Sequence, residues 1–114
     1  MARLPPGMAV SALTLAELAS GPATAANDLT RARRRERVQR TESTFESLPF
    51  DSACARAYGR VCAGVVAAGR KPGRARSVDL MIAATALAHQ MPLYTLNASD
   101  LRGLEDLVEI VDLD

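Results

Sequence analysis

The feature that most constrains this fold is an apolar, helix-like segment followed by a short apolar strand. Ser77–Ala86 carries a single carboxylate, Asp79, near its start and is otherwise mostly apolar. Beyond a helix-breaking proline, Leu93–Leu96 is continuous in the way that strands buried in a parallel sheet are. Asn97 and Asp100 follow this strand. The pattern puts one carboxylate at the mouth of a helix and another just past a buried strand, which suits a hard metal ion bound by oxygen.

The remaining sequence predicts further helices and strands. These are a strand at Gly7–Val10, a helix at Ala12–Leu18 capped by Ser11, a helix that begins near Asn27 or Asp28, an extended link at Leu48–Phe50, a helix capped by Asp51, and a strand at Val108–Val111. Because parallel neighbours need crossover connections, this order predicts an α/β fold with a mainly parallel central sheet flanked by helices. The length fits a single domain over residues 1–114.

The helix after Asp51 is predicted to be a core helix. The apolar residues at helical spacing are Ala55, Tyr58, Val61, Cys62, Val65 and Val66. The only two cysteines, Cys54 and Cys62, are eight positions apart in this helix, which is too far for a disulfide. We therefore expect free thiols. With one histidine and no close pair of cysteines, a zinc site is also not expected.

The composition excludes several classes of protein. Apolar residues make up 48% and charged residues 24% of the chain, as in ordinary globular proteins, which argues against a disordered or fibrous chain. No apolar run approaches the roughly 18 to 20 residues that span a bilayer, and no apolar signal core follows the N-terminus. A cytoplasmic protein without a membrane segment is expected.

The net charge is only +1, but the basic residues are concentrated in two stretches. The first contains Arg31, Arg33, Arg34, Arg35, Arg37 and Arg40, and the second contains Arg70, Lys71, Arg74 and Arg76. Such a run is either a solvated surface, which is the commoner explanation, or a surface that tracks an RNA backbone. With two Phe, two Tyr and no Trp, recognition of shape or backbone fits better than stacking on bases. The candidate RNA-binding residues are Arg33, Arg34, Arg37, Arg74 and Arg76.

Three blocks of this sequence resemble the signature blocks of PIN-domain ribonucleases, specifically the VapC-type toxins of toxin–antitoxin pairs. The blocks are Ser11–Leu18, Asp79–Ala86 and Tyr94–Leu101, and together they cover nearly the whole chain in order and spacing. By position, Glu17 and Asp79 match the second and third acidic residues of the family. Asn97 and Asp100 occupy its fourth acidic region, with Thr95 as a polar neighbour.

This resemblance implies an Mg²⁺- or Mn²⁺-dependent endoribonuclease toxin that cleaves structured RNA. Asp79 would be a metal ligand, Glu17 a ligand or a base that orients water, and Asp100 a ligand directly or through water. Asn97, also a candidate ligand, would mainly position groups, as would Thr95. The resemblance also implies a homodimer and a VapB-type antitoxin whose C-terminal segment places a basic side chain in the acidic pocket.

One part of the family pattern is expected to be absent. Family members begin with a strand that carries the first aspartate and with a helix, whereas this chain opens on what resembles the second strand. We therefore expect an N-terminally incomplete PIN-like domain. The alternative function is a catalytically incomplete binding module that retains antitoxin or dimer contacts.

Each candidate site residue also has a purely structural explanation. Asp79 could simply interact with a helix dipole, Glu17 could be a solvated helix residue, and Asn97 and Asp100 could form a turn. A third class, a small nucleotide-binding α/β domain, is disfavoured because the sequence has no Gly-rich phosphate loop.

Overall fold

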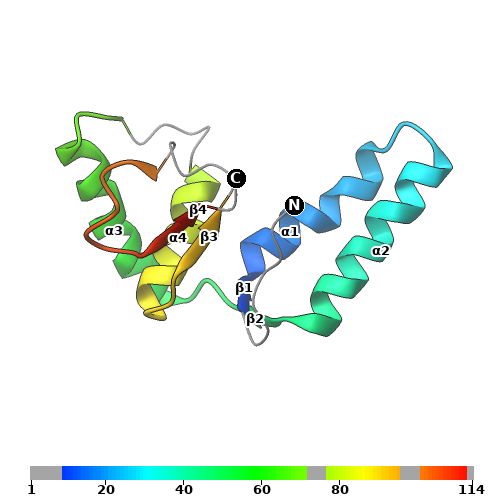
Figure 1. The fold of residues 1–114 in the computed structure, drawn as a ribbon, viewed down its shortest axis with the longest axis horizontal. Helices are drawn as coiled ribbons and strands as arrows, with labels where there is room; N and C mark the ends of the chain where they lie inside the picture. Colours follow the sequence, from blue (N-terminus) through cyan, green and yellow to red (C-terminus); the bar gives the residue numbers. More distant parts are fainter. Residues whose placement is uncertain (1–8, 72–76, 96–100, 113–114) are drawn as a thin grey trace. The chain divides into compact units, whose positions relative to one another are not determined.

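The structure is a computed structural model that describes residues 9–71, 77–95 and 101–112 (Figure 1). The side chains of Thr95 and Asp112 are outside the description. The described residues separate between Pro49 and Phe50 into two compact units. The expected single domain over residues 1–114 stays a prediction.

The N-terminal unit is a helical hairpin joined to a pair of short strands. Its elements are β1 (Ala9–Ser11), α1 (Ala12–Ser20), the 3₁₀ helix η1 (Gly21–Thr24), α2 (Asp28–Thr44) and β2 (Glu46–Leu48). The predicted N-cap Ser11 is confirmed, because Ser11 Oγ accepts the N–H of Leu13 at 3.1 Å. Helix α2 begins where the sequence placed it, and Asn27 Oδ1 caps it by accepting the N–H of Thr30 at 2.8 Å. The strands β1 and β2 pair in parallel, with Ala9 opposite Glu46.

The strand β2 corrects the sequence prediction, which placed only an extended link at Leu48–Phe50. Glu46 and Ser47 are exposed and Leu48 is half-buried. Three residues with one apolar side chain carry no usable periodicity, so the strand exists because β1 pairs with it. Strand formation here is therefore a tertiary effect.

No residue of α2 is buried, which confirms that much of this helix is in contact with water. Its predicted apolar stripe is only partly correct. Val38 and Phe45 are half-buried, but Leu29 is 63% exposed and Ala32 is also exposed.

The C-terminal unit packs two helices and a parallel strand pair. Its elements are α3 (Ser52–Ala67), α4 (Ser77–Ala88), β3 (Leu93–Thr95) and β4 (Ile110–Asp112). Leu93 lies opposite Ile110, and the Leu93 N–H donates to the carbonyl of Glu109 at 2.7 Å. Since both strand pairs are parallel and helices accompany each of them, the predicted α/β class is confirmed.

The core of this unit lies between α3 and α4. The buried side chains of this unit are Cys54, Ala57, Val61 and Val65 of α3, Leu80 and Ala83 through Ala86 of α4, and Leu101, Leu104 and Val108 beyond β3. The predicted α3 stripe was wrong at Ala55 and Val66, which are exposed. The buried positions follow spacings of three and four from Cys54, so the core face lies about one residue earlier than the apolar pattern indicated.

A close backbone approach joins the turn at residues 101–107 to α3. Gly103 has a φ of +94°, and a Cβ there would lie 2.6 Å from the Cβ of Ala68 and 2.9 Å from the carbonyl oxygen of Gly64. Only glycine fits this position without strain. The carboxylate of Glu105 accepts the Gly103 N–H at 2.9 Å and so holds the turn.

Two negative expectations can be compared with the structure. Cys54 and Cys62 form no disulfide, as their spacing predicted. Within the described ranges, no helix is long and apolar enough to cross a membrane.

The N-cap of α3 should make stability depend on pH. Asp51 Oδ1 accepts the N–H of Cys54 at 3.1 Å, and this hydrogen bond is the main cause that lowers the pKa of Asp51 below its ordinary value of 3.8. A lowered pKa means that the ionised cap stabilises the fold above the ordinary value and that this contribution is lost as the pH falls through the folded-state pKa. Asp51→Asn keeps a capping oxygen but cannot ionise.

We expect wild type to melt a few degrees above Asp51→Asn near neutral pH and the difference to shrink as the pH falls below 3.8. Thermal denaturation followed by circular dichroism measures this. Asp51→Ala, which removes the cap, should be less stable at every pH. A difference between wild type and Asp51→Asn that does not change with pH would contradict the assignment.

Candidate active site

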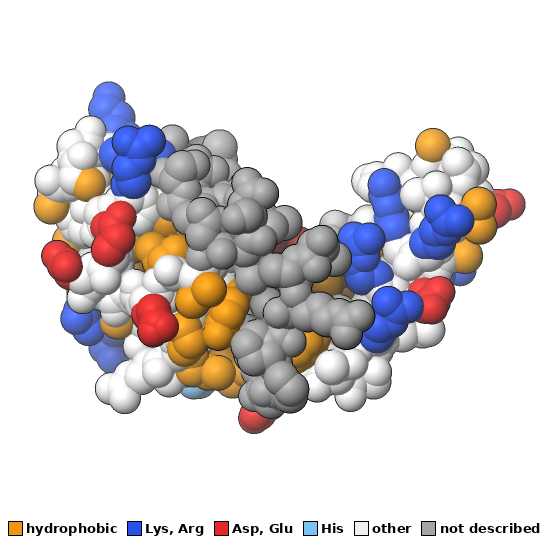
Figure 2. All heavy atoms as spheres, in the orientation of Figure 1, with side chains coloured by type: hydrophobic (Ala, Val, Ile, Leu, Met, Phe, Trp, Pro, Cys, Tyr) orange, Lys and Arg blue, Asp and Glu red, His pale blue; other side chains and the backbone are white. Residues whose placement is uncertain are grey.

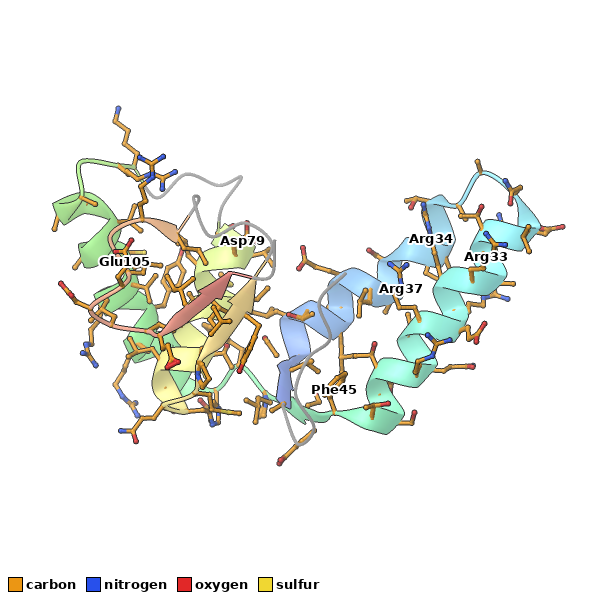
Figure 3. All side chains as sticks on the ribbon, viewed as in Figure 1. Arg33, Arg34, Arg37, Phe45, Asp79 and Glu105 are labelled. Atoms are coloured by element: carbon orange, nitrogen blue, oxygen red, sulfur yellow. The ribbon has the colours of Figure 1, made fainter. Side chains whose placement is uncertain are left out.

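Asp79 lies in the first turn of α4 and is half-buried (Figure 3). The positive end of a helix dipole stabilises a negative charge at this position. Behind it, α4 is anchored by five buried residues, Leu80 and Ala83 through Ala86. The carboxylate therefore sits on one of the most firmly packed elements of its unit, as the sequence predicted.

The chain reverses direction between α4 and β3. Gln90 has a φ of +54°, and the N–H of Met91 donates to the Ala86 carbonyl at 2.9 Å, which closes α4 before β3 begins. The first turn of α4 and the C-terminal end of β3 consequently lie at the same end of the unit (Figure 1). The predicted partners of Asp79 at that end, Asn97 and Asp100, lie outside the described residues, as does the side chain of Thr95.

Glu17 is exposed on α1, and its main-chain carbonyl accepts the hydroxyl of Ser20 at 2.7 Å. It belongs to the N-terminal unit, whereas Asp79 belongs to the C-terminal unit. The expected convergence of the two carboxylates stays a prediction.

Binding of a divalent metal would require several ligand side chains to converge within the described part of the chain. There, no group of three or more His, Cys, Asp or Glu side chains could hold a metal ion. Carboxylates such as Asp79 and Glu17 are the oxygen ligands that Mg²⁺ prefers. The described residues thus provide the right ligand type but not a complete donor set.

Two arginines of the basic run hold the hairpin together, a role that the sequence did not reveal. Arg34 Nη1 donates to the carbonyl of Gly21 at 2.9 Å and to the hydroxyl of Thr24 at 3.2 Å (Figure 3). Arg31 pairs with Asp28 at 2.6 Å and donates to the carbonyl of Ala25 at 3.4 Å. These guanidinium groups satisfy carbonyls of η1 and of the turn after it, so Arg34, a candidate RNA ligand, is already engaged within its own unit.

The other arginines of the run are exposed. Arg33, Arg35, Arg37 and Arg40 lie on the parts of α2 that face solvent, and basic side chains are visible over this helix in Figure 2. Arg40 forms an exposed ion pair with Glu36 at 2.7 Å. The predicted RNA ligands Arg74 and Arg76 lie outside the described residues.

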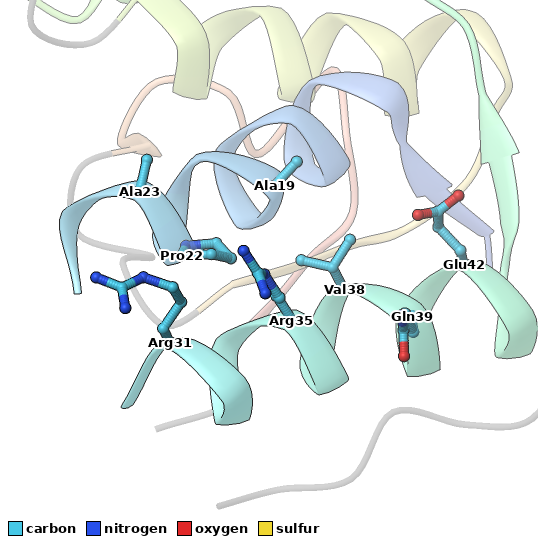
Figure 4. Close-up of a pocket in the computed structure, with 8 residues that line it drawn as sticks. All are labelled: Ala19, Pro22, Ala23, Arg31, Arg35, Val38, Gln39 and Glu42. Atoms are coloured by element: carbon cyan, nitrogen blue, oxygen red, sulfur yellow. The ribbon is translucent and has the colours of Figure 1, made fainter. Parts of the chain in front are cut away.

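A groove of about 520 Å³ separates α2 from α1 and η1, and no sequence pattern indicated it. Ala19, Pro22 and Val38 supply apolar lining, and Arg31, Arg35 and Glu42 supply charges (Figure 4). Arg35 therefore belongs to a different surface from Arg33, although the two are close in sequence.

Comparisons with known proteins agree with this architecture. A family model described as PIN domain matches residues 1–107. A search of curated proteins finds no match.

Several solved structures share the fold. A member of the VapBC family of toxin–antitoxin systems, VapBC-5 from Mycobacterium tuberculosis, has a TM-score of 0.80 and 33% identity, covering 91% of this chain and 80% of that chain. DNA-bound VapBC from Salmonella typhimurium has a TM-score of 0.71 and 28% identity, and the match covers 94% of this chain and 76% of that chain. FitAcB from Neisseria gonorrhoeae has a TM-score of 0.76 and 26% identity, and the match covers 91% of this chain and 73% of that chain.

The hydrogen bonds of Arg34 predict a loss of stability when its side chain is truncated. A hydrogen bond that involves a charged group contributes about 1.5 to 3 kcal/mol. Because one of the two bonds of Arg34 is only partly buried and the other is exposed, their contribution is smaller, and Arg34→Ala should lower the free energy of unfolding by about 1 to 2 kcal/mol in total. Arg33→Ala is the matched control, because it removes the same side chain from the exposed neighbouring position and should change stability by less than about 0.5 kcal/mol. Urea denaturation of both variants measures this, and equal effects would show that Arg34 has no structural role.

Proposed function

Because this chain belongs to the PIN-domain family and is of the VapC type, we propose that it is a metal-dependent endoribonuclease toxin. Its reaction would be hydrolysis of a phosphodiester bond in structured RNA, in the cytoplasm. PIN domains are generally nucleases. The proposal depends mainly on the position of Asp79, a carboxylate that corresponds to an acidic residue of the family motif and that lies in the first turn of the well-packed helix α4.

The proposed roles of the acidic residues follow from their positions. Asp79 would be the most rigidly positioned ligand, since the burial of α4 restricts the movement of its first turn. Glu17 would be a second ligand or would orient water, and Asp100 a third ligand with Asn97 and Thr95 positioning groups beside it. Bound Mg²⁺ or Mn²⁺ would supply activation of water and neutralisation of charge on the phosphate.

A VapB-type antitoxin is the proposed partner that silences the protein. Support comes from the solved relatives, which include VapBC toxin–antitoxin proteins, one of them bound to DNA. A homodimer and contacts of the RNA with Arg33, Arg37, Arg74 and Arg76 are part of the same proposal. Arg34 is left out of this set because its guanidinium group already bonds to Gly21 and Thr24.

The second candidate function is a binding module that retains the fold and the antitoxin contacts but does not cleave RNA. The observation that favours it is the lack of a three-ligand cluster among the residues that the structure describes. Metal binding separates the two candidates, because only the nuclease needs it.

Asp79→Asn tests the nuclease directly. Loss of a residue that only hydrogen-bonds to a metal ligand typically lowers metal affinity or activity by about 10- to 100-fold. Removal of a ligand itself should therefore slow RNA cleavage by more than about 100-fold and weaken Mn²⁺ binding. Cleavage is followed on gels, and Mn²⁺ binding is measured by calorimetry. Asp106→Asn is the control, since Asp106 is an exposed carboxylate outside the proposed site and its loss should change neither quantity.

Two outcomes would contradict the nuclease. A folded wild-type chain that neither binds Mn²⁺ nor cuts RNA would favour the binding module. An Asp79→Asn variant that cleaves at the wild-type rate would show that Asp79 is not part of the site.

A further inference from the structure

The exposed arginines of α2 fall on two different flanks of the helix. The half-buried residues of α2 and its C-cap are Thr30, Arg31, Arg34, Val38, Thr41 and Phe45, which recur at helical spacing and define the inner face. At 100° per residue, Arg33, Arg37 and Arg40 lie on one flank of this face. Arg35 lies on the other flank, where it lines the groove.

Arg33, Arg37 and Arg40 form a continuous stripe. Their spacing of four and then three residues places neighbouring side chains about 5 to 6 Å apart at Cβ. From Arg33 to Arg40 the stripe extends over eight residues, or about 10 Å of helix axis. Three guanidinium groups are thus aligned along one edge of a helix with no buried residue.

The internal ion pairs leave this stripe available. Asp28 is paired with Arg31, whose side chain is 35% exposed and faces the hairpin turn. Glu36 is paired with Arg40, but both side chains are more than 65% exposed. An ion pair this exposed contributes only about 0 to 1 kcal/mol, so a phosphate can replace the carboxylate on Arg40.

We propose that the stripe of Arg33, Arg37 and Arg40 binds the phosphate backbone of the RNA, and that Arg34 does not contact RNA but holds the hairpin. The inference rests on the proposed ribonuclease function. Guanidinium groups bind phosphate oxygens in a bidentate manner, and a row of them needs no pocket to follow a backbone.

A protein partner fits this flank less well. Protein interfaces are built around apolar or aromatic centres. The one large apolar side chain that α2 exposes within the described residues is Leu29, at 63%. A single leucine beside three arginines does not supply such a centre.

Charge reversal tests the stripe. Arg33→Glu with Arg37→Glu, placed in the Asp79→Asn chain so that the RNA stays intact, should weaken binding of a labelled RNA hairpin at least about tenfold at 50 mM salt. Because each lost phosphate contact removes about 0.7 to 0.9 from the slope of log K against log salt, the slope should fall by about 1.4 to 1.8. Fluorescence anisotropy between 50 and 200 mM salt measures both quantities.

The matched control is Arg56→Glu with Arg60→Glu. These two arginines are exposed on α3 with the same spacing of four, so the control changes the net charge equally. Its salt slope should stay that of the parent. Equal weakening by the two double variants, or no weakening by either, would overturn the stripe. So would a parent that does not bind RNA.

A single substitution should act in the opposite direction. Glu36→Gln removes the carboxylate that competes for Arg40 and should tighten RNA binding a few-fold, because Arg40 becomes free for phosphate. Arg34→Gln should lower stability while leaving the salt slope unchanged in the folded protein. An unchanged affinity of Glu36→Gln would exclude Arg40 from the stripe, and a reduced slope for Arg34→Gln would overturn its separate role.

The outcomes also separate this inference from the function on which it rests. RNA that binds through the stripe but is never cut by the wild-type chain would remove the nuclease and keep the surface. RNA that is cut normally by the Arg33 and Arg37 double variant in an otherwise wild-type chain, with unchanged affinity, would keep the nuclease and remove the surface. If the double variant instead lost binding only to an acidic peptide, the stripe would be a protein-binding surface and the inference would be wrong.

Discussion

The packing of α3 against α4 is the interaction on which the C-terminal unit depends. Val61 and Leu80 are fully or almost fully buried between the two helices, and the small side chains of Ala83 and Ala84 are completely buried. Alanines on α4 allow a close approach, and Leu104 fills the space beside them. Because this contact fixes the rotation of α4, it also determines the direction in which Asp79 leaves the first turn.

The N-terminal unit is stabilised in a different way. Neither α1 nor α2 has a buried residue, so little apolar area is removed from water. The hairpin is held by N-caps, by the parallel pairing of β1 with β2, and by the guanidinium groups of Arg31 and Arg34 on main-chain carbonyls. A helix stabilised from one side by polar contacts is free to present the charges of its other flank to solvent.

These two modes of stabilisation match the two chemical tasks that we propose for the protein. A carboxylate that must keep its geometry belongs on a well-packed helix, as Asp79 does. Contacts with an RNA backbone need charge and reach more than a fixed geometry, and long arginine side chains on an exposed helix provide both. The arginines of the basic run are therefore not equivalent, although their composition and spacing look uniform in the sequence.

By itself, the sequence determined the features that depend on neighbouring residues. The caps Ser11 and Asp51 were predictable because a capping side chain bonds to a backbone N–H two or three residues away. The α/β class and the position of Asp79 followed in the same way from local periodicity and from the three family-like blocks.

Only the tertiary structure decided the features that join distant residues. Strand β2 forms because Glu46 lies opposite Ala9, and Arg34 becomes structural because it reaches Gly21, thirteen residues earlier. The core face of α3 includes Ala57 and excludes Val66 because the partner helix, and not hydrophobicity alone, selects the side that is buried. Such contacts depend on how elements pack, and no local pattern of residues encodes that packing.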